Sequence, residues 1–294
     1  MKLALGNSLA MPRIGGAAAF VGALDDYTAN LSAAWSVARR LLGSYSGALL
    51  RVRRSSDDAE QDIGADSFGL LDEGALQSFI GSDSAYVTTV YHQAGGSNLV
   101  QTTAAYQPRI ANAGTIETAN APAMKFDGVN DYLTCAAVNL NEMAWYVATK
   151  SAGSTPSYCG VISQPAGAAW SVPYAHIALD TFGGSLYRQW VESETYAAAV
   201  GAYVANTTYL LEVHNVNGSG NFGVHNGVDG SAAGAPATVS DSVQAFLVGV
   251  PHQTLIGSYN YNGYIGEILA WGAGYDSTAR AARRAVMNDF WVLY

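Results

Sequence analysis

Short segments with alternating apolar and polar residues follow one another through most of the chain. They recur at intervals of roughly ten residues, and glycine or asparagine often separates them. Because successive side chains of a strand point to opposite faces, this period of two predicts strands with one face on a core. Clear examples are SAYVTTVYHQ (84–93), TYLLEVHNV (208–216) and GYIGEILAWG (263–272). The pattern predicts an all-β fold, in which two antiparallel sheets pack as a β-sandwich.

Three segments instead repeat apolar residues at helical spacing. The first two, 31–43 and 71–81, predict short helices. The third, 278–290, predicts a closing helix that begins after Asp276 or Ser277. Its expected buried stripe comprises Ala279, Ala282, Val286 and Phe290.

Residues 1–26 are rich in glycine and alanine and show no sustained period. Their scattered apolar side chains would be costly to expose, at about 25 cal/mol per Å². We therefore predict an N-terminal arm that docks on another chain, with packing along its own sandwich as the alternative. Residues 27–294 are predicted to form one sandwich domain.

Composition excludes several classes of protein. The net charge is −9, and between residues 110 and 279 three basic residues stand against twelve acidic ones. That region would repel a phosphate backbone, so we expect no nucleic-acid binding. No apolar run reaches the about 18 residues of a membrane span, so we expect no membrane insertion. Cys135 and Cys159 are too few for a disulfide framework or a zinc site, although one disulfide would be feasible.

Charge is concentrated in SYSGALLRVRRSSDDAEQDIG (44–64). Arg51 and Arg53 alternate with apolar residues on a predicted strand, and Asp57 and Asp62 belong to the acidic segment that follows. Bidentate arginine–carboxylate pairs would fix that segment against the strand. We predict structural ion pairs here, with a partner-protein interface and phosphate binding as alternatives.

Candidate ligand-binding residues gather towards the end of the chain. Tyr259 and Tyr261 stand two apart in GSYNYNGY (257–264), which places both rings on one face of an extended segment. His252 and Trp190 could add to them. Such rings stack on a glycan, bury into a partner or serve ordinary packing, and all three alternatives stay open.

Metal and cofactor motifs are absent from the sequence. The histidines are scattered, without the third ligand that a zinc site needs. Asp127, Asn130 and Asp131 could hold calcium at the rim of the sandwich, but an Asx turn is the simpler explanation. We therefore predict no cofactor, with rim calcium as the alternative.

Several stretches resemble known sandwich proteins. AMKFDGVNDYLTC (123–135) resembles the entry hairpin of laminin-G-like, concanavalin-type jelly rolls, and residues 262–292 resemble their last strand and closing helix. SVARRLLGSYSGALLRVRRSSDDAEQDIG (36–64) and VTTVYHQAGGSNLVQT (87–102) resemble the front of the catalytic domain of α-L-arabinofuranosidase B. They resemble still more closely the phage and prophage virion proteins that share this domain. The resemblance implies a jelly-roll sandwich with a few short helices.

The resemblance also implies where catalysis would lie. In the arabinofuranosidases the nucleophile is a Glu within Asp-x-Glu-Asn-Asn, and the acid/base is an Asp after Gly-Ile-Gly-Gly. Here the best nucleophile candidate is Glu192 or Glu194, without the paired asparagines, and the acid/base position holds Pro251, His252 and Gln253. Loss of a proton donor alone costs roughly 10²–10⁴-fold in rate. We therefore predict a protein without catalysis, in which Glu192 is a nucleophile only under the enzyme alternative.

With the resemblance to virion proteins, these observations predict a structural or adhesive phage protein located in the virion. It would be a head- or tail-attached fibre, a decoration protein or a receptor-binding protein. Its expected partners are other virion proteins, copies of itself in a homo-oligomer, and a host surface glycan. The alternatives are an arabinofuranosidase-like glycoside hydrolase acting on surface polysaccharide and a prophage-encoded, lectin-like binding module.

Overall fold

A computed structural model describes most of the chain. The described residues are 20–138, 143–153, 158–165, 177–182, 186–191, 193–202, 204–216, 220–233, 244–272 and 277–293. Within these ranges no helix combines the length and the apolar character needed to cross a membrane.

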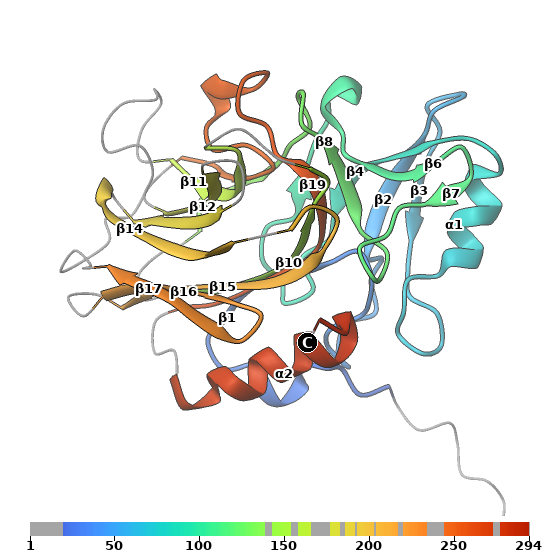
Figure 1. Ribbon diagram of the computed structural model, residues 1–294. Coiled ribbons are helices and arrows are strands. Elements are labelled where there is room, and N and C mark those ends of the chain that lie inside the picture. The colour runs from blue at the N-terminus through green and yellow to red at the C-terminus, as the bar shows by residue number, and fades with distance from the viewer. Residues whose placement is uncertain are drawn as a thin grey trace, which may run out of the picture.

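Two layers of antiparallel strands form the body of the protein (Figure 1). The first layer contains, in spatial order, β1 (Leu31–Ser36), β19 (Asn262–Trp271), β10 (Ala144–Ser151), β15 (Thr208–Val216), β16 (Gly220–His225) and β17 (Val228–Ala233). All described strand pairings are antiparallel, which confirms the predicted all-β sandwich.

The second layer runs from β14 (Ser193–Ala202) through β13 (Leu186–Val191), β12 (Ile177–Phe182), β11 (Gly160–Gln164), β18 (Phe246–Val248), β9 (Leu133–Cys135), β5 (Leu99–Val100), β4 (Ala85–Val90) and β2 (Leu50–Arg54) to β3 (Glu60–Ile63). Two further strands, β6 (Arg109–Asn112) and β8 (Met124–Asp127), connect β4 to the first half of β19, and β7 (Thr115–Ile116) pairs with β6. The two layers are therefore joined along one side.

Two apolar cores hold the layers. The larger lies between the sheets and includes Trp35, Trp145 and Phe246, whose rings stack with centroid separations of 5.8 and 4.9 Å. The smaller lies between the first layer and the closing helix, and includes Tyr146 and Trp291. Strand β10 contributes to both cores, so apolar residues occupy both of its faces and it lacks the alternation of a half-exposed strand.

The helix predicted over 31–43 is wrong, because β1 occupies its first half. Trp35 faces the core between the sheets, while Ala34 faces the helix side, and Ala34 pairs with Leu269 of β19. A strand that is covered on both faces carries a continuous apolar run, which periodicity alone does not distinguish from a buried helix.

The two other predicted helices are confirmed. Helix α1 (Glu73–Ile80) starts at Asp72, whose side chain accepts a hydrogen bond from the N–H of Ala75 at 2.8 Å. Helix α2 (Arg280–Trp291) follows the 3₁₀ turn η4 (Ser277–Ala279) and lies against the outer face of the first layer (Figure 1). The fully buried residues of α2 lie one position later than predicted, at Arg283, Met287 and Trp291.

The last residues of the predicted arm pack on the sandwich. Leu24 is fully buried, and its N–H donates to the carbonyl of Leu41 at 2.9 Å. The ring of Phe20 lies 3.7 Å from the Arg40 guanidinium, and a 3₁₀ turn, η1 (Asp25–Tyr27), follows. An arm can therefore comprise only earlier residues, and residues 1–19 lie outside the described part of the chain.

Candidate functional site

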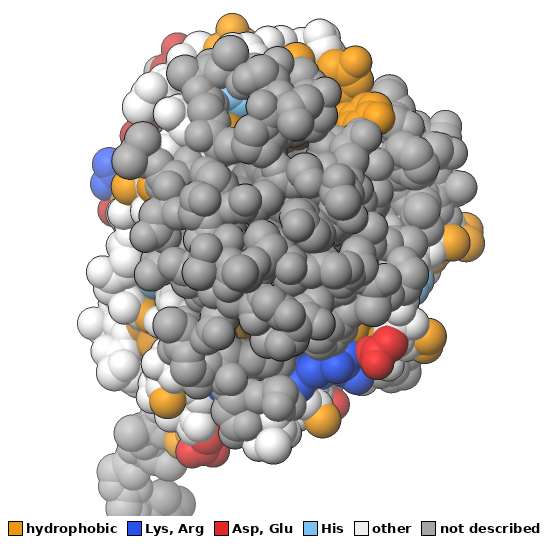
Figure 2. Space-filling view, turned by 90° about the vertical axis from the view of Figure 1, so that its left-hand side faces the viewer, with side chains coloured by type: hydrophobic (Ala, Val, Ile, Leu, Met, Phe, Trp, Pro, Cys, Tyr) orange, Lys and Arg blue, Asp and Glu red, His pale blue; other side chains and the backbone are white. Residues whose placement is uncertain are grey.

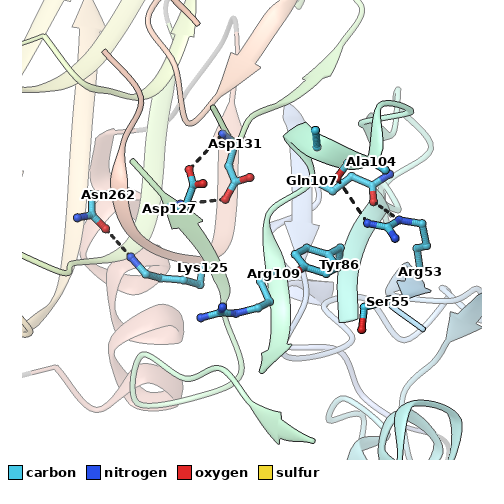
Figure 3. Close-up of a pocket in the computed structure, with 11 residues that line it drawn as sticks. Arg53, Ser55, Tyr86, Ala104, Gln107, Arg109, Lys125, Asp127, Asp131 and Asn262 are labelled. Carbon is cyan, nitrogen blue, oxygen red and sulfur yellow. Dashed lines mark hydrogen bonds between the residues drawn. The ribbon is translucent and has the colours of Figure 1, made fainter. Parts of the chain in front are cut away.

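A polar cavity of about 680 Å³ opens where β2, β4, β6 and β8 meet the start of β19 (Figure 3). Its lining combines cationic, acidic, aromatic and amide side chains. The chemically distinctive members are Arg53, Arg109, Lys125, Asp127, Asp131 and Tyr86. Such a lining suits a ligand with many polar groups better than an apolar one.

Four of these side chains form a row across adjacent strands. In the strand registers, Arg53 pairs with Tyr86, Tyr86 with Arg109, and Arg109 with Lys125. Directly paired residues of antiparallel strands share a face, so the four side chains project on the same side. Figure 3 shows them in sequence along the cavity.

Each cation of the row is positioned by polar neighbours. Arg53 donates to Gln107 Oε1 at 2.8 Å and lies 5.0 Å from the centre of the Tyr86 ring. Arg109 pairs with Glu117 at 2.6 Å. Lys125 Nζ donates to Asn262 Oδ1 and to the carbonyl of Phe126.

The two carboxylates of the cavity belong to the turn between β8 and β9. Asp127 Oδ1 accepts hydrogen bonds from the N–H groups of Val129 and Asn130, at 2.7 and 3.1 Å. In return, the N–H of Asp127 donates to Asp131 Oδ2 at 2.9 Å. This is Asx-turn geometry, and rim calcium at Asp127, Asn130 and Asp131 stays an untested alternative. Among the described residues, no three His, Cys, Asp or Glu side chains form a group suited to a metal ion.

Burial changes the protonation of two groups in this cavity. It raises the pKa of Asp131 from 3.8 to about 7, and the charge of Asp127 adds to the effect. Burial also lowers the pKa of Lys125 from 10.5 to about 8. Both groups therefore change charge within a unit or two of neutral pH.

The positions that resemble catalytic ones lie elsewhere in the chain. Glu192 is outside the described residues, and for Glu194 and Trp190 only the backbone, in β14 and β13, is described. Gln253 begins the 3₁₀ turn η3 (Gln253–Leu255), and its Nε2 donates to Gln244 Oε1 at 3.4 Å. His252 precedes this turn and is fully buried.

Tyr261 and His252, two of the candidate ligand-binding residues, are packed inside the protein. Tyr261 is fully buried, and its hydroxyl lies 2.9 Å from Thr149 Oγ1 and 3.2 Å from the hydroxyl of Tyr187. It belongs to the core and cannot stack on an external ligand. His252 is equally inaccessible, and Tyr259 is partly exposed, edge-to-face with Tyr158 at 6.2 Å.

The arginines of the charged segment contact the carboxylates that follow them. Arg51 pairs with Asp62 at 2.7 Å, across the β2–β3 hairpin. Arg53 pairs with Asp58, also at 2.7 Å, while Asp57 pairs with Arg54 at 2.6 Å. These contacts lie within one hairpin, while Arg53 also reaches the cavity.

Sequence reasoning missed the row of Tyr86, Arg109 and Lys125. These residues lie far apart in the chain, and only the pairing of β6 with β4 and β8 brings them together. Each of these residues falls at a polar-face position of a period-two strand, which indicates that its side chain is accessible. The pattern does not say which strands are neighbours, so it could not predict that the residues form a row.

Part of the chain matches α-L-arabinofuranosidases. Residues 26–156 match the family model described as "Alpha-L-arabinofuranosidase B, catalytic". Alpha-L-arabinofuranosidase B of Aspergillus oryzae is 39% identical over 71 residues, which are 24% of this chain and 14% of that protein. A probable alpha-L-arabinofuranosidase B of Aspergillus fumigatus is 38% identical over 91 residues, or 29% of this chain and 18% of that protein.

Solved structures share the fold. An arabinofuranosidase complexed with arabinofuranosyl-α-1,2-xylobiose superimposes with a TM-score of 0.70 at 15% identity, covering 92% of this chain and 65% of the other. A GH54 α-L-arabinofuranosidase soaked with a cyclic sulfate inhibitor gives 0.70 at 16% identity, covering 93% and 65%. The chain thus spans less than a fifth of the curated relatives and under two thirds of these solved chains. At such identity the likeness establishes the fold, an all-β jelly-roll sandwich.

These findings correct the functional prediction made from the sequence. The matches are to arabinofuranosidases, and nothing in them points to phage virion proteins. The predicted virion function, virion localisation and virion partners are therefore wrong. The prediction of a protein without catalysis is contradicted as well, because the matched family model describes a catalytic domain.

Proposed function

We propose that this chain is a glycoside hydrolase domain of the α-L-arabinofuranosidase type, acting on arabinofuranosyl groups of a polysaccharide. The observation that carries the proposal is the match of residues 26–156 to the arabinofuranosidase B catalytic model. The two Aspergillus relatives support it, since each is more than a third identical over its matched stretch.

Glycoside hydrolysis requires a carboxylate on each side of the scissile bond. On the nucleophile side, Glu192 is the candidate and Glu194 is the alternative two positions later. The residues on either side of Glu192, Val191 and Ser193, pair with one another in the register of β13 and β14, and the backbone of Glu194 belongs to β14.

On the proton-donor side, the stretch that resembles the acid/base position carries Pro251, His252 and Gln253. None of the three is a carboxylic acid, and the amide of Gln253 can hydrogen-bond a glycosidic oxygen but cannot protonate it. Leaving groups that depart as stable anions need no protonation, whereas sugar and alkyl alcohols do. The proposed enzyme is therefore expected to cleave activated aryl arabinofuranosides far faster than unactivated ones.

The test is hydrolysis of 4-nitrophenyl and methyl α-L-arabinofuranoside by the purified chain. We expect release of 4-nitrophenol, and a loss on the order of 10³-fold or more in Glu192→Gln. Glu194→Gln makes the same isosteric change at the alternative nucleophile, and it should leave release nearly unchanged if Glu192 is the nucleophile. Gln253→Glu is expected to raise turnover of the methyl glycoside, by up to about 10²-fold. No release from either substrate would refute the proposed activity, and release that survives Glu192→Gln would refute Glu192 as the nucleophile. Loss of release in Glu194→Gln alone would assign that role to Glu194.

A further inference from the structure

The row of Arg53, Tyr86, Arg109 and Lys125 has the dimensions of an oligosaccharide site. It crosses β2, β4, β6 and β8, so its ends are three inter-strand spacings apart, or about 14 Å. The cavity of about 680 Å³ lies over it. An extended chain of a few sugar units can follow such a row, where a single small ion would occupy only one end.

One end of the row is closed by the protein itself. The register continues from Lys125 to Tyr264 and then to Lys150. Glu117 pairs with Arg109, however, and Lys150 Nζ donates to the carbonyl of Thr118 at 2.8 Å. Tyr264 and Lys150 do not line the cavity, so the open part of the row ends at Lys125.

The charges favour an anionic group at this closed end. Arg53 and Arg109 each have a carboxylate partner, Asp58 and Glu117. Lys125 has only neutral acceptors, Asn262 Oδ1 and the Phe126 carbonyl, within the described part of the chain. Burial lowers the pKa of Lys125, and Glu117, Asp127 and Asp131 lie near enough to raise it in part, but the hydrogen bonds of its ammonium go to the neutral acceptors, so a ligand carboxylate can still bind it directly.

The remaining lining suits the rest of a sugar. Tyr86 is partly exposed between Arg53 and Arg109, so it offers an aromatic surface in the middle of the row (Figure 3). Asp127 is exposed and accepts hydrogen bonds, and Asn262 has an amide group at the same edge of the cavity. Hydroxyl groups pair well with carboxylate and amide side chains of this kind.

We propose that this row binds an acidic oligosaccharide, with a uronate carboxylate on Lys125 and Arg109 and a sugar ring on Tyr86. The proposal rests on the proposed function for its ligand class, since a polysaccharide hydrolase meets acidic sugars in its substrate. It shares no residue with Glu192 or Gln253.

The charges of the cavity also set the expected pH dependence. The groups around Lys125 are Glu117, Arg109, Asp127 and Asp131. Between pH 6 and pH 9, Asp131 loses its proton and becomes negative, and Lys125 loses its proton and becomes neutral. The cavity therefore becomes more negative by about two charges, and affinity for an anion falls over this range.

Isothermal titration calorimetry of the full chain at pH 6 tests the proposal, with trigalacturonate, neutral arabinotriose and inorganic phosphate as separate ligands. We expect trigalacturonate to bind at least about tenfold more tightly than arabinotriose, and Lys125→Met to weaken it about tenfold or more. Lys150→Met is the matched control. It removes the same charge over the same Tyr264 ring, 4.3 Å from its centre, outside the cavity. It should change the affinity less than about twofold.

Equal affinity for the neutral and acidic trisaccharides overturns the proposal, and so does binding of phosphate as tight as that of trigalacturonate. An unchanged affinity in Lys125→Met also overturns it. The comparison of ligands on the unmodified chain decides the matter even if the variant does not fold. Calorimetry needs no turnover. A chain that binds trigalacturonate without hydrolysing arabinofuranosides therefore contradicts only the proposed activity. A chain that hydrolyses arabinofuranosides without binding trigalacturonate contradicts only the proposal that the row binds an acidic oligosaccharide.

Discussion

Replacing Glu267 by Gln is expected to lower the free energy of unfolding more than the removal of a charge from an exposed ion pair does. Glu267 is fully buried on β19 and accepts from Arg39 Nε at 2.9 Å and from Arg39 Nη2 at 2.7 Å. Ser36 also donates to it, at 3.0 Å, and the Arg39 guanidinium lies 4.2 Å from the centre of the Phe290 ring. The pair thus ties the end of β1, β19 and helix α2 together.

The expected size follows from burial. Gln preserves the shape of Glu267 but leaves the Arg39 charge without a counter-ion, and breaking a buried pair in this way costs about 3–5 kcal/mol. Unfolding entropy of about 2.1 cal/mol/K per residue gives about 0.6 kcal/mol/K for 294 residues. The melting temperature should therefore fall by about 5–8 °C.

The chain contains a matched control for this measurement. Arg51 binds Asp62 through the same two donors, Nε at 2.7 Å and Nη2 at 2.9 Å, but both side chains are 43% exposed. Water already solvates this pair, so Asp62→Asn should cost at most about 1 kcal/mol and shift the melting temperature by no more than about 2 °C. Differential scanning calorimetry of both variants compares the same geometry at two depths of burial.

A double variant separates a missing charge from a missing contact. Arg39→Met with Glu267→Leu removes both charges and keeps apolar volume, so it should recover at least half of the loss of Glu267→Gln. The reasoning is refuted if Glu267→Gln melts no lower than Asp62→Asn. It is also refuted if the double variant is less stable than the single one, because desolvation would then not be the dominant cost.

Two further predictions concern packing and protonation. A Cβ added to Gly266 would lie 2.0 Å from Trp291 Cη2, so Gly266→Ala should displace α2 and lower the free energy of unfolding in urea by about 1–3 kcal/mol. Gly64 has open space around it, so Gly64→Ala is the control and should be near neutral. Equal effects of the two substitutions would contradict this prediction. The folded-state pKa of Asp131 is raised to about 7, so between about pH 4 and pH 7 the folded protein keeps a proton that the unfolded chain has lost. The free energy of unfolding should therefore fall as the pH rises over this range, by at most about 4 kcal/mol. Asp131→Asn should remove this slope in urea titrations at pH 5 and 8, and an unchanged slope would show that Asp131 is not its source.

Local patterns predicted those parts of the fold that local interactions determine. Asp72 caps α1 and Met287 and Trp291 anchor α2, and both helices follow from amphipathic spacing. Strand β1 escaped prediction because its environment, not its spacing, decides its structure. Trp35 meets one core and Ala34 the other, and no single-sequence pattern reveals that two layers cover the segment.

The candidate site depended even more on long-range pairing. The alternation of Tyr261 with Tyr259 left glycan contact, a partner interface and ordinary packing open, and the structure shows packing, because Tyr261 lies at the junction of β19 with the core and its hydroxyl lies 2.9 Å from Thr149 Oγ1. In contrast, the hairpin that pairs Arg51 with Asp62 is local, and the proximity of these residues could be read from adjacent segments. Residues brought together by neighbouring strands in the chain are predictable, whereas the row from Arg53 to Lys125 requires knowledge of the strand order.

The distribution of the family match explains why function was harder to predict than fold. Residues 26–156 cover β1 to β10, which include the charged hairpin and the row in the cavity. The positions that resemble catalytic ones, Glu192 and Gln253, fall outside this match. The matched part of the chain therefore carries no information about the positions proposed for catalysis. The two regions still meet in the structure, because Asn260 Nδ2 donates to the carbonyl of Asp131 at 3.1 Å. The segment that follows Gln253 is thus attached, through Asn260, to the turn that lines the cavity.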